Sequence, residues 1–535
     1  MKQNPILRGF HPDPSIIRVA EDYYLATSTF EWYPGVRIYH SRNLLDWSLV
    51  ATPLNRLSQL DMRGHPDSCG VWAPCLSYCG GQFYLVYTNT RRYNSHCKDT
   101  PNYLVTTEDI RGDWSDPIYL NSSGFDPSLF HDDDGRKWLL NMQWDHRQRG
   151  ARDDWDPQHY FGGILLQEYD STAGQLVGSA CKIFDGSPLG KSEGPHLYHR
   201  GGYYYLLLAE GGTGEHHACT VARSEQLAGP YAIDPRGPLM TSADHPAHLL
   251  QRAGHGDFID TPAGASFMVH LCSRPLKNGR SVMGRETAIQ QIDWQDGWPR
   301  LISEGTLPAV DCPMDSSGSS AQAPDIEDRL ENFDGDKLPE DFQTLRCPLD
   351  SQTLSLNARK GYLRLFGRES LGSLFLQALV ARRQQSFQFQ ASTVIDFAPE
   401  NFQQMAGLVC YYNSSKYHYL FLSHHEQQGR VLDVVSCKGD LAAEYSLDQP
   451  IPLPASGEIH LRATVDNAEL RFHYALAKDQ WHELPIILDY SLLADEVGDG
   501  GEHANFTGSF VGLCCQDMSG NRQAADFDFF HYKEL

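Results

Sequence analysis

The stretch Gly9-Phe10-His11-Pro12-Asp13-Pro14-Ser15-Ile16 places one carboxylate between two prolines, close to the start of a chain of 535 residues. Each proline ring fixes its own φ angle and restricts the residue before it, so the backbone around Asp13 has little freedom. The apolar run 16–27 that follows predicts a β-strand. A carboxylate held rigidly where a strand begins suits a general base, and an aspartate in an ordinary proline-rich turn is the alternative.

The same unit occurs five times in the first three-fifths of the chain. Each copy has a short apolar strand, a turn rich in Gly or Asp, and a second strand rich in aromatic residues, which is the pattern of a β-hairpin. The copies begin at positions 13, 74, 126, 194 and 255, a period of about 60 residues that is typical of a propeller-like repeat. No helical periodicity separates them. The sequence therefore predicts a five-bladed β-propeller with four strands in each blade.

A change in composition marks the end of this repeat. Residues 307–328 are polar and rich in Pro, Ser and Gly, which predicts a linker. From about residue 331 onward, short strands of alternating polarity predict a β-sandwich. We therefore expect an all-β chain with a catalytic propeller over 1–307, a linker over 308–330 and a β-sandwich domain over 331–535.

The composition limits the partners of the protein. A formal net charge of −24 and a pI near 5.3 argue against nucleic acids and anionic membranes, and they favour a neutral substrate. We find no secretory leader and no apolar run long enough to span a membrane, so we expect a cytoplasmic protein. The 13 cysteines lack the spacing of a zinc site and are expected to be reduced thiols. We also expect a homo-oligomer.

Three acidic residues occupy equivalent places in the repeat. Asp13, Asp126 and Glu193 each stand where the first strand of a hairpin begins, and a proline follows each within two residues. Because the innermost strands of a propeller begin near one mouth of the central channel, the repeat should bring the three carboxylates together. Clustered like charges shift one another's pKa values, as is typical of an active site. For each residue alone, a role in a turn or a cap is the alternative.

Five motifs resemble those of a known family. They are Gly-Phe-His-Pro-Asp-Pro-Ser (9–15), Gly-Val-Trp-Ala-Pro (70–74), Gly-Phe-Asp-Pro-Ser-Leu-Phe-His-Asp (124–132), Glu-Gly-Pro-His-Leu-Tyr (193–198) and Gly-Arg-Glu-Thr-Ala (284–288). The whole chain resembles glycoside hydrolase family 43, and in particular its β-xylosidases with a C-terminal concanavalin-like β-sandwich. The resemblance implies that Asp13 is the general base, that Glu193 is the general acid, and that Asp126 tunes and orients the acid.

The chain departs from this family's pattern at two positions. The second-blade motif usually continues with Asp, where this chain has Cys75, and Cys69 stands where Gly is usual. These changes remove a nearby carboxylate and leave the details of the sugar subsites open, but they leave the three acidic residues in place.

The resemblance also implies residues that bind the sugar. Phe30, Trp72 and Trp144 are implied as walls of the pocket, and packing between blades is the alternative for each. Arg285 is the best candidate for a cation beside the sugar, and an ordinary strand-edge ion pair is its alternative.

A histidine is implied on the propeller axis. The resemblance places His255 near Asp13, where relatives use a histidine with water or a calcium ion. We see no cluster of oxygen ligands in the sequence that would hold calcium, so we expect no cofactor, with a structural calcium ion near His255 and a purely structural histidine as the alternatives.

One aromatic residue of the predicted sandwich is also implied in the pocket. Phe506 follows a polar, glycine-rich segment, 497–503, and such loops often reach across domain boundaries. In the family that this chain resembles, an aromatic residue here closes one side of the sugar pocket. We therefore predict that the sandwich closes the active-site pocket and makes the enzyme exo-acting. The alternative places Phe506 in the core of the sandwich.

The resemblance implies an exo-acting glycosidase that releases xylose from the non-reducing end of β-1,4-xylo-oligosaccharides, with terminal α-L-arabinofuranosides as further substrates. The resemblance implies inversion, and carboxylates on separate blades suit the separation of roughly 6.5–9.5 Å that inversion needs. One alternative is an α-L-arabinofuranosidase as the main activity. A retaining fructosidase would be expected to show Arg-Asp-Pro and Glu-Cys motifs that are missing here. The last alternative is a non-catalytic carbohydrate-binding protein.

Overall fold

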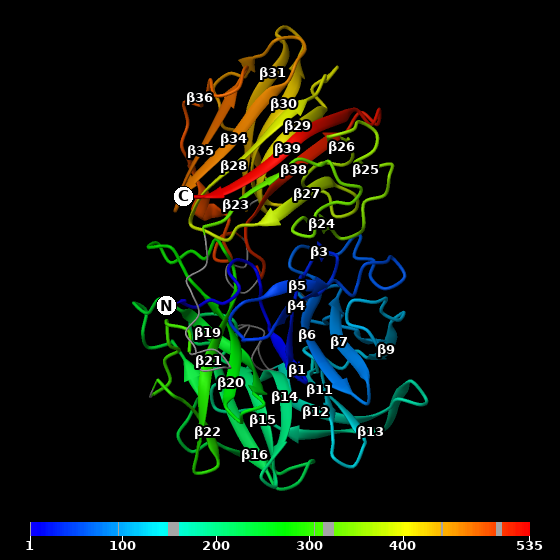
Figure 1. Ribbon diagram of the computed structural model, residues 1–535, viewed down its shortest axis with the longest axis vertical. Coiled ribbons are helices and arrows are strands. Elements are labelled where there is room, and N and C mark those ends of the chain that lie inside the picture. The colour runs from blue at the N-terminus through cyan, green and yellow to red at the C-terminus, as the bar shows by residue number, and fades with distance from the viewer. Residues whose placement is uncertain are drawn as a thin grey trace. The chain divides into compact units, whose positions relative to one another are not determined.

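The computed structural model describes residues 2–94, 96–147, 160–303, 305–313, 326–439, 442–498 and 505–535. Within these ranges the chain forms β-strands and one short 3-10 helix, Tyr490–Leu492, and it contains no α-helix. The chain divides into two units (Figure 1). The first comprises 1–60, 69–274 and 285–323, and the second comprises 61–68, 275–284 and 324–535. Of the predicted linker, residues 314–325 lie outside the described residues.

Five antiparallel sheets of the first unit form the blades of a propeller, and this confirms the predicted fold class. Blade one contains β1 (Ser15–Val19), β2 (Asp22–Thr27), β4 (Arg37–Ser41) and β5 (Ser48–Ala51), and blade two contains β6 (Gly70–Cys79), β7 (Gln82–Thr90), β8 (Asn102–Thr107) and β9 (Ile118–Asn121). Blade three contains β10 (Ser128–His131), β11 (Lys137–Trp144), β12 (Phe161–Asp170) and β13 (Gln175–Phe184), and blade four contains β14 (Glu193–Arg200), β15 (Tyr203–Glu210), β16 (Ala218–Ser224) and β17 (Ala232–Ile233), with β18 (Met240–Thr241) also paired with β16. Blade five contains β19 (Gln251–Asp260), β20 (Ser266–Ser273), β21 (Glu286–Gln295) and β22 (Trp298–Leu301). A two-residue strand, β3 (Trp32–Tyr33), follows β2 in the sequence.

The second strand of each blade explains why the sequence adopts this architecture. Strands β2, β7, β15 and β20 are almost continuously apolar or aromatic, and nearly every residue in them is buried. A strand that is buried on both faces needs a layer on each side, which the neighbouring blades of a propeller provide. The first strands of the blades, β1, β6, β10, β14 and β19, contact one another around the axis. The residues at which these five strands begin are therefore gathered at the centre of the first unit.

The second unit is a sandwich of two antiparallel sheets. One sheet contains β25 (Leu354–Ser355), β26 (Leu363–Phe366), β39 (Ala524–Glu534), β28 (Gln388–Asp396), β34 (Ile459–Asp466), β35 (Glu469–Ala475) and β36 (His482–Glu483), with β23 (Asp328–Glu331) on β39 and β37 (Leu488–Asp489) on β35. The other contains β27 (Ala378–Arg383), β38 (Phe510–Asp517), β29 (Gln404–Asn413), β30 (Lys416–His425), β31 (Gly429–Lys438) and β32 (Ala443–Tyr445), with β33 (Ile451–Pro452) on β31. A further short strand is β24 (Thr344–Leu345).

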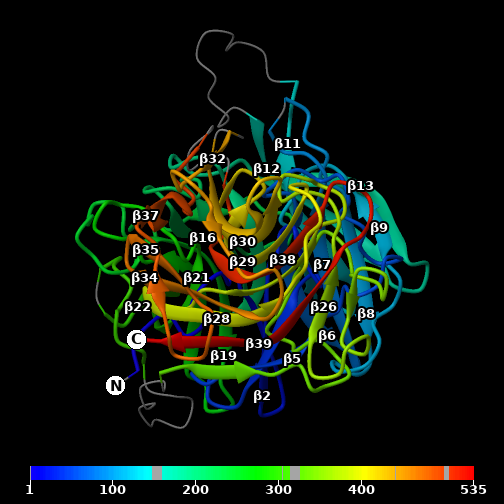
Figure 2. The same cartoon turned by 90° about the horizontal axis from the view of Figure 1, so that it is seen from above.

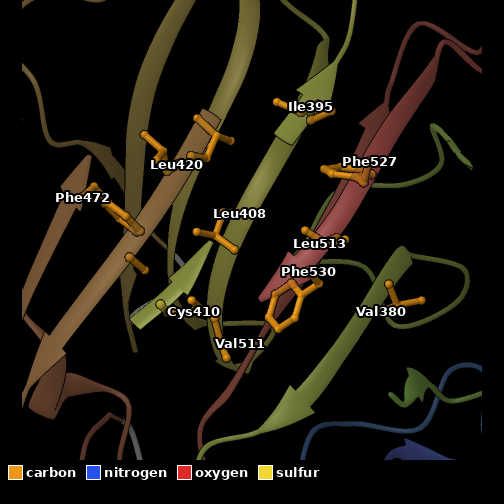
Figure 3. Close-up of a cluster of buried hydrophobic side chains, with 14 of the residues drawn as sticks. Val380, Ile395, Leu408, Cys410, Leu420, Phe472, Val511, Leu513, Phe527 and Phe530 are labelled. Carbon is orange, nitrogen blue, oxygen red and sulfur yellow. The ribbon is translucent and has the colours of Figure 1, made fainter. Parts of the chain in front are cut away.

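The core of the sandwich lies between these sheets. In β34 every second residue is buried, as expected when one face of a strand packs on a core and the other faces water. Leu408 and Leu420 from one sheet meet Phe472 and Phe527 from the other (Figure 3). Strands β28 and β39, which are paired along most of their length, lie side by side in both views (Figures 1 and 2).

Two further observations bear on the predictions from composition. All 13 cysteines of the chain are free thiols. In the part of the chain that the structure describes, no helix has the length and apolar character that a membrane span requires.

Candidate active site

The three predicted carboxylates lie where three blades begin. Asp13 precedes β1, Asp126 precedes β10, and Glu193 is the first residue of β14. All three are buried, with 4%, 8% and 8% of their surface exposed, respectively. Asp13 and Asp126 have φ angles of 53° and 54°, in the left-handed region that residues with a side chain rarely adopt. Strained conformations of this kind cluster at functional sites, because the surrounding structure must hold them in place.

Asp13 is surrounded by hydrogen-bond donors. Its Oδ1 accepts a hydrogen bond of 2.9 Å from Arg285 Nη1, and its Oδ2 accepts one from the hydroxyl of Ser28. The guanidinium group of Arg285 also lies 5.2 Å from the ring centroid of Phe30. Two donors therefore fix the orientation of this carboxylate, one of them a buried cation.

Glu193 has a contrasting environment. Burial and the nearby negative charge of Asp13 raise the pKa of Glu193 to about 7, and the positive charges of Arg285, Lys191 and Lys98 act in the opposite direction. A carboxyl group with this pKa keeps its proton in a large fraction of molecules near neutral pH. Glu193 therefore has the property that a general acid needs.

The pKa of Asp126 depends on the charge of Glu193. Burial and the charges of Glu193 and Asp13 raise the pKa of Asp126 well above its usual range, although Arg285 and the backbone N–H of Gly194 favour its ionised form. Ionisation of Glu193 therefore opposes ionisation of Asp126. The role of Asp126 in tuning Glu193 stays a prediction.

Aromatic side chains form a continuous row beside the carboxylates. Phe30, Trp72 and Trp144 are buried, with 3%, 8% and 9% of their surface exposed. The ring centroids of Phe30 and Trp72 are 6.1 Å apart. Phe125 connects Trp72 with Trp144, because its ring centroid lies 5.3 Å from that of Trp72 and 6.4 Å from that of Trp144. Phe125 was not predicted as a wall residue, although it immediately precedes Asp126 in the third motif.

A lysine lies within this aromatic row. Lys98 donates a hydrogen bond of 2.8 Å to the carbonyl oxygen of Tyr93, and the loop that bears it is held by a 3.0 Å hydrogen bond from Trp144 Nε1 to the carbonyl of His96. Burial lowers the pKa of Lys98 to about 8, and the charge of Glu193 opposes this effect. Its Nζ lies 4.4 Å from the ring centroid of Trp144, 5.4 Å from Tyr93 and 6.0 Å from both Trp72 and Phe125.

Lys98 could not be recognised from the sequence, because the loop around it has no strand pattern and belongs to no motif. A lysine packed against several aromatic faces retains favourable electrostatic contacts after it leaves water. This position makes Lys98 a further candidate for interaction with Glu193 and with a polar ligand.

His255, like Arg285, lies beside Oδ1 of Asp13. Its Nδ1 is 3.8 Å from Asp13 Oδ1, and burial lowers the pKa of His255 to about 4, so the ring is neutral at neutral pH. A Cβ atom at Gly194, where φ is +55°, would lie 2.9 Å from Cε1 of this ring. The glycine that follows the candidate acid is therefore required for close packing against His255.

The acidic residue Asp257 near His255 is engaged by other groups. The nearby carboxylate of Asp257 already accepts hydrogen bonds from Ser15 Oγ, Ile16 N and the hydroxyl of Tyr198. Among the described residues, the one group of three or more side chains close enough to share a metal ion is Asp132, Asp133 and His199, which lies away from the three carboxylates at an exposed turn. The expectation that hydrolysis needs no cofactor stays a prediction.

Three further residues named from the sequence are Cys69, Cys75 and Phe506. Cys69 is buried, and Cys75 packs in an apolar cluster with Tyr84, Val86 and Leu129, where burial raises its pKa to about 12. Cys75 therefore serves as a small core residue. Phe506 belongs to the second unit and is partly buried, and its place in the sugar pocket stays a prediction. Residues 499–504, in the segment before it, lie outside the described residues.

Comparison with known proteins accounts for nearly the whole chain. A family model described as "Glycosyl hydrolases family 43" matches residues 2–299, and one described as "Beta xylosidase C-terminal Concanavalin A-like domain" matches residues 330–533. A protein of Humicola insolens named "Xylosidase/arabinosidase 43B" is 51% identical, and the match covers 100% of this chain and 98% of that protein. The "Beta-xylosidase" of Bacillus subtilis (strain 168) is 47% identical, with 99% of both chains covered. The crystal structure of xylan beta-1,4-xylosidase from Bacillus halodurans C-125 has a TM-score of 0.95 and 47% identity, with 100% of both chains covered.

Proposed function

We propose, because the chain belongs to glycoside hydrolase family 43, that it is an exo-acting β-1,4-xylosidase that inverts the anomeric centre. The family and the glycosidase class were both predicted from the sequence, and both are confirmed. The observation that supports the assignment best is the contrast between two buried carboxyl groups. Asp13 is bound by Arg285, whereas burial and Asp13 raise the pKa of Glu193 to about 7.

In the proposed mechanism these two groups act on opposite faces of the sugar. Glu193 donates its proton to the glycosidic oxygen as the bond to the anomeric carbon breaks. Asp13 accepts a proton from the water molecule that attacks the anomeric carbon from the other face. One inversion follows, and neither carboxylate forms a bond to the sugar. Burial and the charge of Asp13 hold the pKa of Glu193 high enough for the proton to be present when substrate binds, and Asp126 is assigned the role of tuning and orienting this acid.

The aromatic row supports a sugar as the substrate. Flat apolar faces pack against the C–H groups of a sugar ring, and a few fixed polar groups select its hydroxyls. Phe30, Trp72 and Trp144 provide the faces, and Arg285 and Lys98 provide polar groups beside them. A xylopyranose ring lacks the exocyclic hydroxymethyl group of a hexose. An arabinofuranose keeps such a group on its smaller ring but presents hydroxyls similar to those of xylose, so terminal α-L-arabinofuranosides are proposed as further substrates.

A panel of nitrophenyl glycosides tests this proposal. We expect the highest kcat/KM on the β-xyloside, lower activity on the α-L-arabinofuranoside and none on the β-glucoside. Release of xylose from the non-reducing end of labelled xylotriose checks the exo-action, and β-1,3-linked xylobiose serves as a linkage control. A preference for the arabinofuranoside would support the second candidate function, for which the name of the Humicola insolens relative is the specific observation. Absence of turnover on every glycoside would reject both.

Two further parts of the proposal concern the protein in its cell. We propose a cytoplasmic location, which the 13 free cysteines support, since reduced thiols persist in that compartment. We also propose a homo-oligomer. Sedimentation equilibrium checks this state, and a single species at the 60.2 kDa mass of one chain would contradict it.

A further inference from the structure

A cavity of about 600 Å³ lies in the sandwich unit, separate from the carboxylate site of the first unit. The loops that follow β26 and β38 form it (strands labelled in Figure 1). Its lining contains two arginines and two acidic residues. The residues that the argument uses are Arg368, Glu369, Ser373, Asp517, Met518 and Arg522.

Asp517 builds the loop that contains one of the arginines. Its carboxylate accepts hydrogen bonds from the backbone N–H groups of Ser519, at 2.9 Å, and Gln523, at 2.8 Å. Its own N–H donates to the carbonyl of Arg368 at 2.7 Å. The chain after β38 therefore turns back on itself and brings Arg522 beside Arg368.

The two guanidinium groups converge on one backbone oxygen. Nη2 of Arg368 and Nη2 of Arg522 both donate hydrogen bonds to the carbonyl oxygen of Gln352. Arg368 Nε donates a second hydrogen bond, of 3.1 Å, to Thr353 Oγ1. Among the described residues, neither arginine forms an ion pair with a carboxylate. Arg522 Nη2 also lies 3.2 Å from the side-chain oxygen of Gln352. Within the described ranges, the hydrogen-bond acceptors of the two cations are therefore all neutral, and the other N–H groups of both guanidinium groups can serve a ligand.

A neighbouring arginine shows the more usual arrangement. Arg364 makes a bidentate ion pair with Asp526, at 2.6 and 2.7 Å, and this raises its pKa. Burial and the positive charge of Arg522 instead lower the pKa of Arg368, with Asp350 as the opposing charge. The sandwich thus neutralises one arginine with a carboxylate and leaves two others together without one.

The acidic residues near the cavity are engaged with their own loops. Oε2 of Glu369 accepts hydrogen bonds from Ser373 Oγ and from the backbone N–H of Leu376, at 2.9 Å. Asp350 accepts from the N–H of Gln352, at 3.1 Å, and from Thr353 Oγ1, at 3.0 Å. These carboxylates hold the loops in place and do not pair with either arginine.

We propose that this cavity binds a small oxyanion, a carboxylate or a phosphate, between Arg368 and Arg522. Guanidinium groups match both anions because their N–H donors form a planar fork. The carboxylate of an acidic saccharide and free inorganic phosphate are the two sources of this chemistry. The site is independent of the proposed hydrolysis, so its test does not depend on turnover.

Titration calorimetry of the full-length protein tests the proposal, with inorganic phosphate, glucuronate and neutral xylose as separate probes. We expect phosphate or glucuronate, or both, to bind at the cavity, and the one that binds more tightly identifies the source. Arg522→Gln should weaken that binding about tenfold, the scale of one charge-assisted hydrogen bond. Arg522 is exposed, so this variant should keep the fold and the melting temperature of the wild type.

Two matched variants complete the test: one should strengthen anion binding, and the other should leave it unchanged. Glu369→Gln should strengthen anion binding, because it removes a negative charge from the lining but keeps an acceptor for Ser373 and Leu376. Arg471→Gln removes the same charge from an exposed ion pair elsewhere on the sandwich and should leave binding unchanged. The proposal is overturned if neither anion binds, if both bind no better than xylose, or if Arg522→Gln and Arg471→Gln reduce binding equally.

Discussion

Asp13 and the Asp126–Glu193 pair occupy equivalent places in the propeller repeat, yet their surroundings differ. Asp13 meets the guanidinium group of Arg285 and the hydroxyl of Ser28. Across the site, burial and neighbouring carboxylates raise the pKa values of Asp126 and Glu193. The same chemical group can therefore serve as base in one blade and acid in another, and the partners supplied by neighbouring segments decide which. The variants below test this difference.

The largest effect is expected at the base. Asp13→Asn keeps the shape of the side chain but removes the proton acceptor, so kcat should fall by roughly 10²- to 10⁴-fold or more. Steady-state kinetics on xylobiose measure the loss. Asp116→Asn, at an aspartate whose side chain is 73% exposed, is the matched control and should retain full activity. If Asp13→Asn stays within about tenfold of the wild type, Asp13 is not the base.

The effect at the acid should depend on the leaving group. Glu193→Gln cannot protonate the glycosidic oxygen, so xylobiose, which has a poor leaving group, should lose orders of magnitude in kcat. A dinitrophenyl xyloside needs no such proton and should be hydrolysed at a rate much closer to that of the wild type. Comparison of kcat for both substrates in both proteins gives the ratio. Equal losses on the two substrates would count against Glu193 as the acid.

A smaller effect is expected when the carboxyl pair is broken. Activity requires protonated Glu193 and should fall as the pH rises through its pKa of about 7. Ionisation of Asp126 and ionisation of Glu193 oppose each other, so Asp126→Asn, which cannot ionise, should lower the pKa of Glu193 and move the alkaline limb of the pH–rate profile to lower pH. The profile of kcat/KM measures this shift. An alkaline limb that stays in place would reject the tuning role of Asp126.

The smallest effect is expected at Lys98, where a substitution should move the alkaline limb of the pH–rate profile to higher pH. The positive charge of Lys98 favours ionised Glu193, so Lys98→Met should raise the pKa of Glu193 and move the alkaline limb to higher pH, by about half a unit. The same pH–rate measurement detects it. Lys438→Met removes a lysine from an exposed ion pair with Glu444 and should leave the profile unchanged. If the alkaline limb moved to lower pH in Lys98→Met, the charge of Lys98 would not favour ionised Glu193 as this account requires.

The repeat explains why much of this site could be predicted. Because every blade begins with the same turn and strand, Asp13, Asp126 and Glu193 could be assigned to equivalent places before any contact was known. The family resemblance suggested Arg285 and His255 beside them. The structure brings these residues together, since Arg285 and His255 both lie within 4 Å of Asp13 Oδ1.

Long-range contacts could not be predicted in this way. Lys98 lies in a loop without periodicity, and its place among the aromatic rings depends on two blades. Segments 61–68 and 275–284 look like propeller loops in the sequence but group with the sandwich unit. For segment 61–68, the fully buried Arg346 of the sandwich unit explains this grouping. Its side chain donates hydrogen bonds to Asp67, at 2.7 Å, and to the carbonyl oxygen of His65, at 2.8 Å. Partners nearly 280 positions apart leave no local pattern.

The stereochemistry of the first product tests the division between base and acid most directly. If Asp13 activates water, proton NMR of early hydrolysis should show α-xylose released from a β-xyloside, with the β-anomer appearing only by later mutarotation. If Asp13 attacked the sugar itself, the covalent intermediate would give β-xylose first. Early α-xylose is the result that this account predicts, and early β-xylose would contradict it.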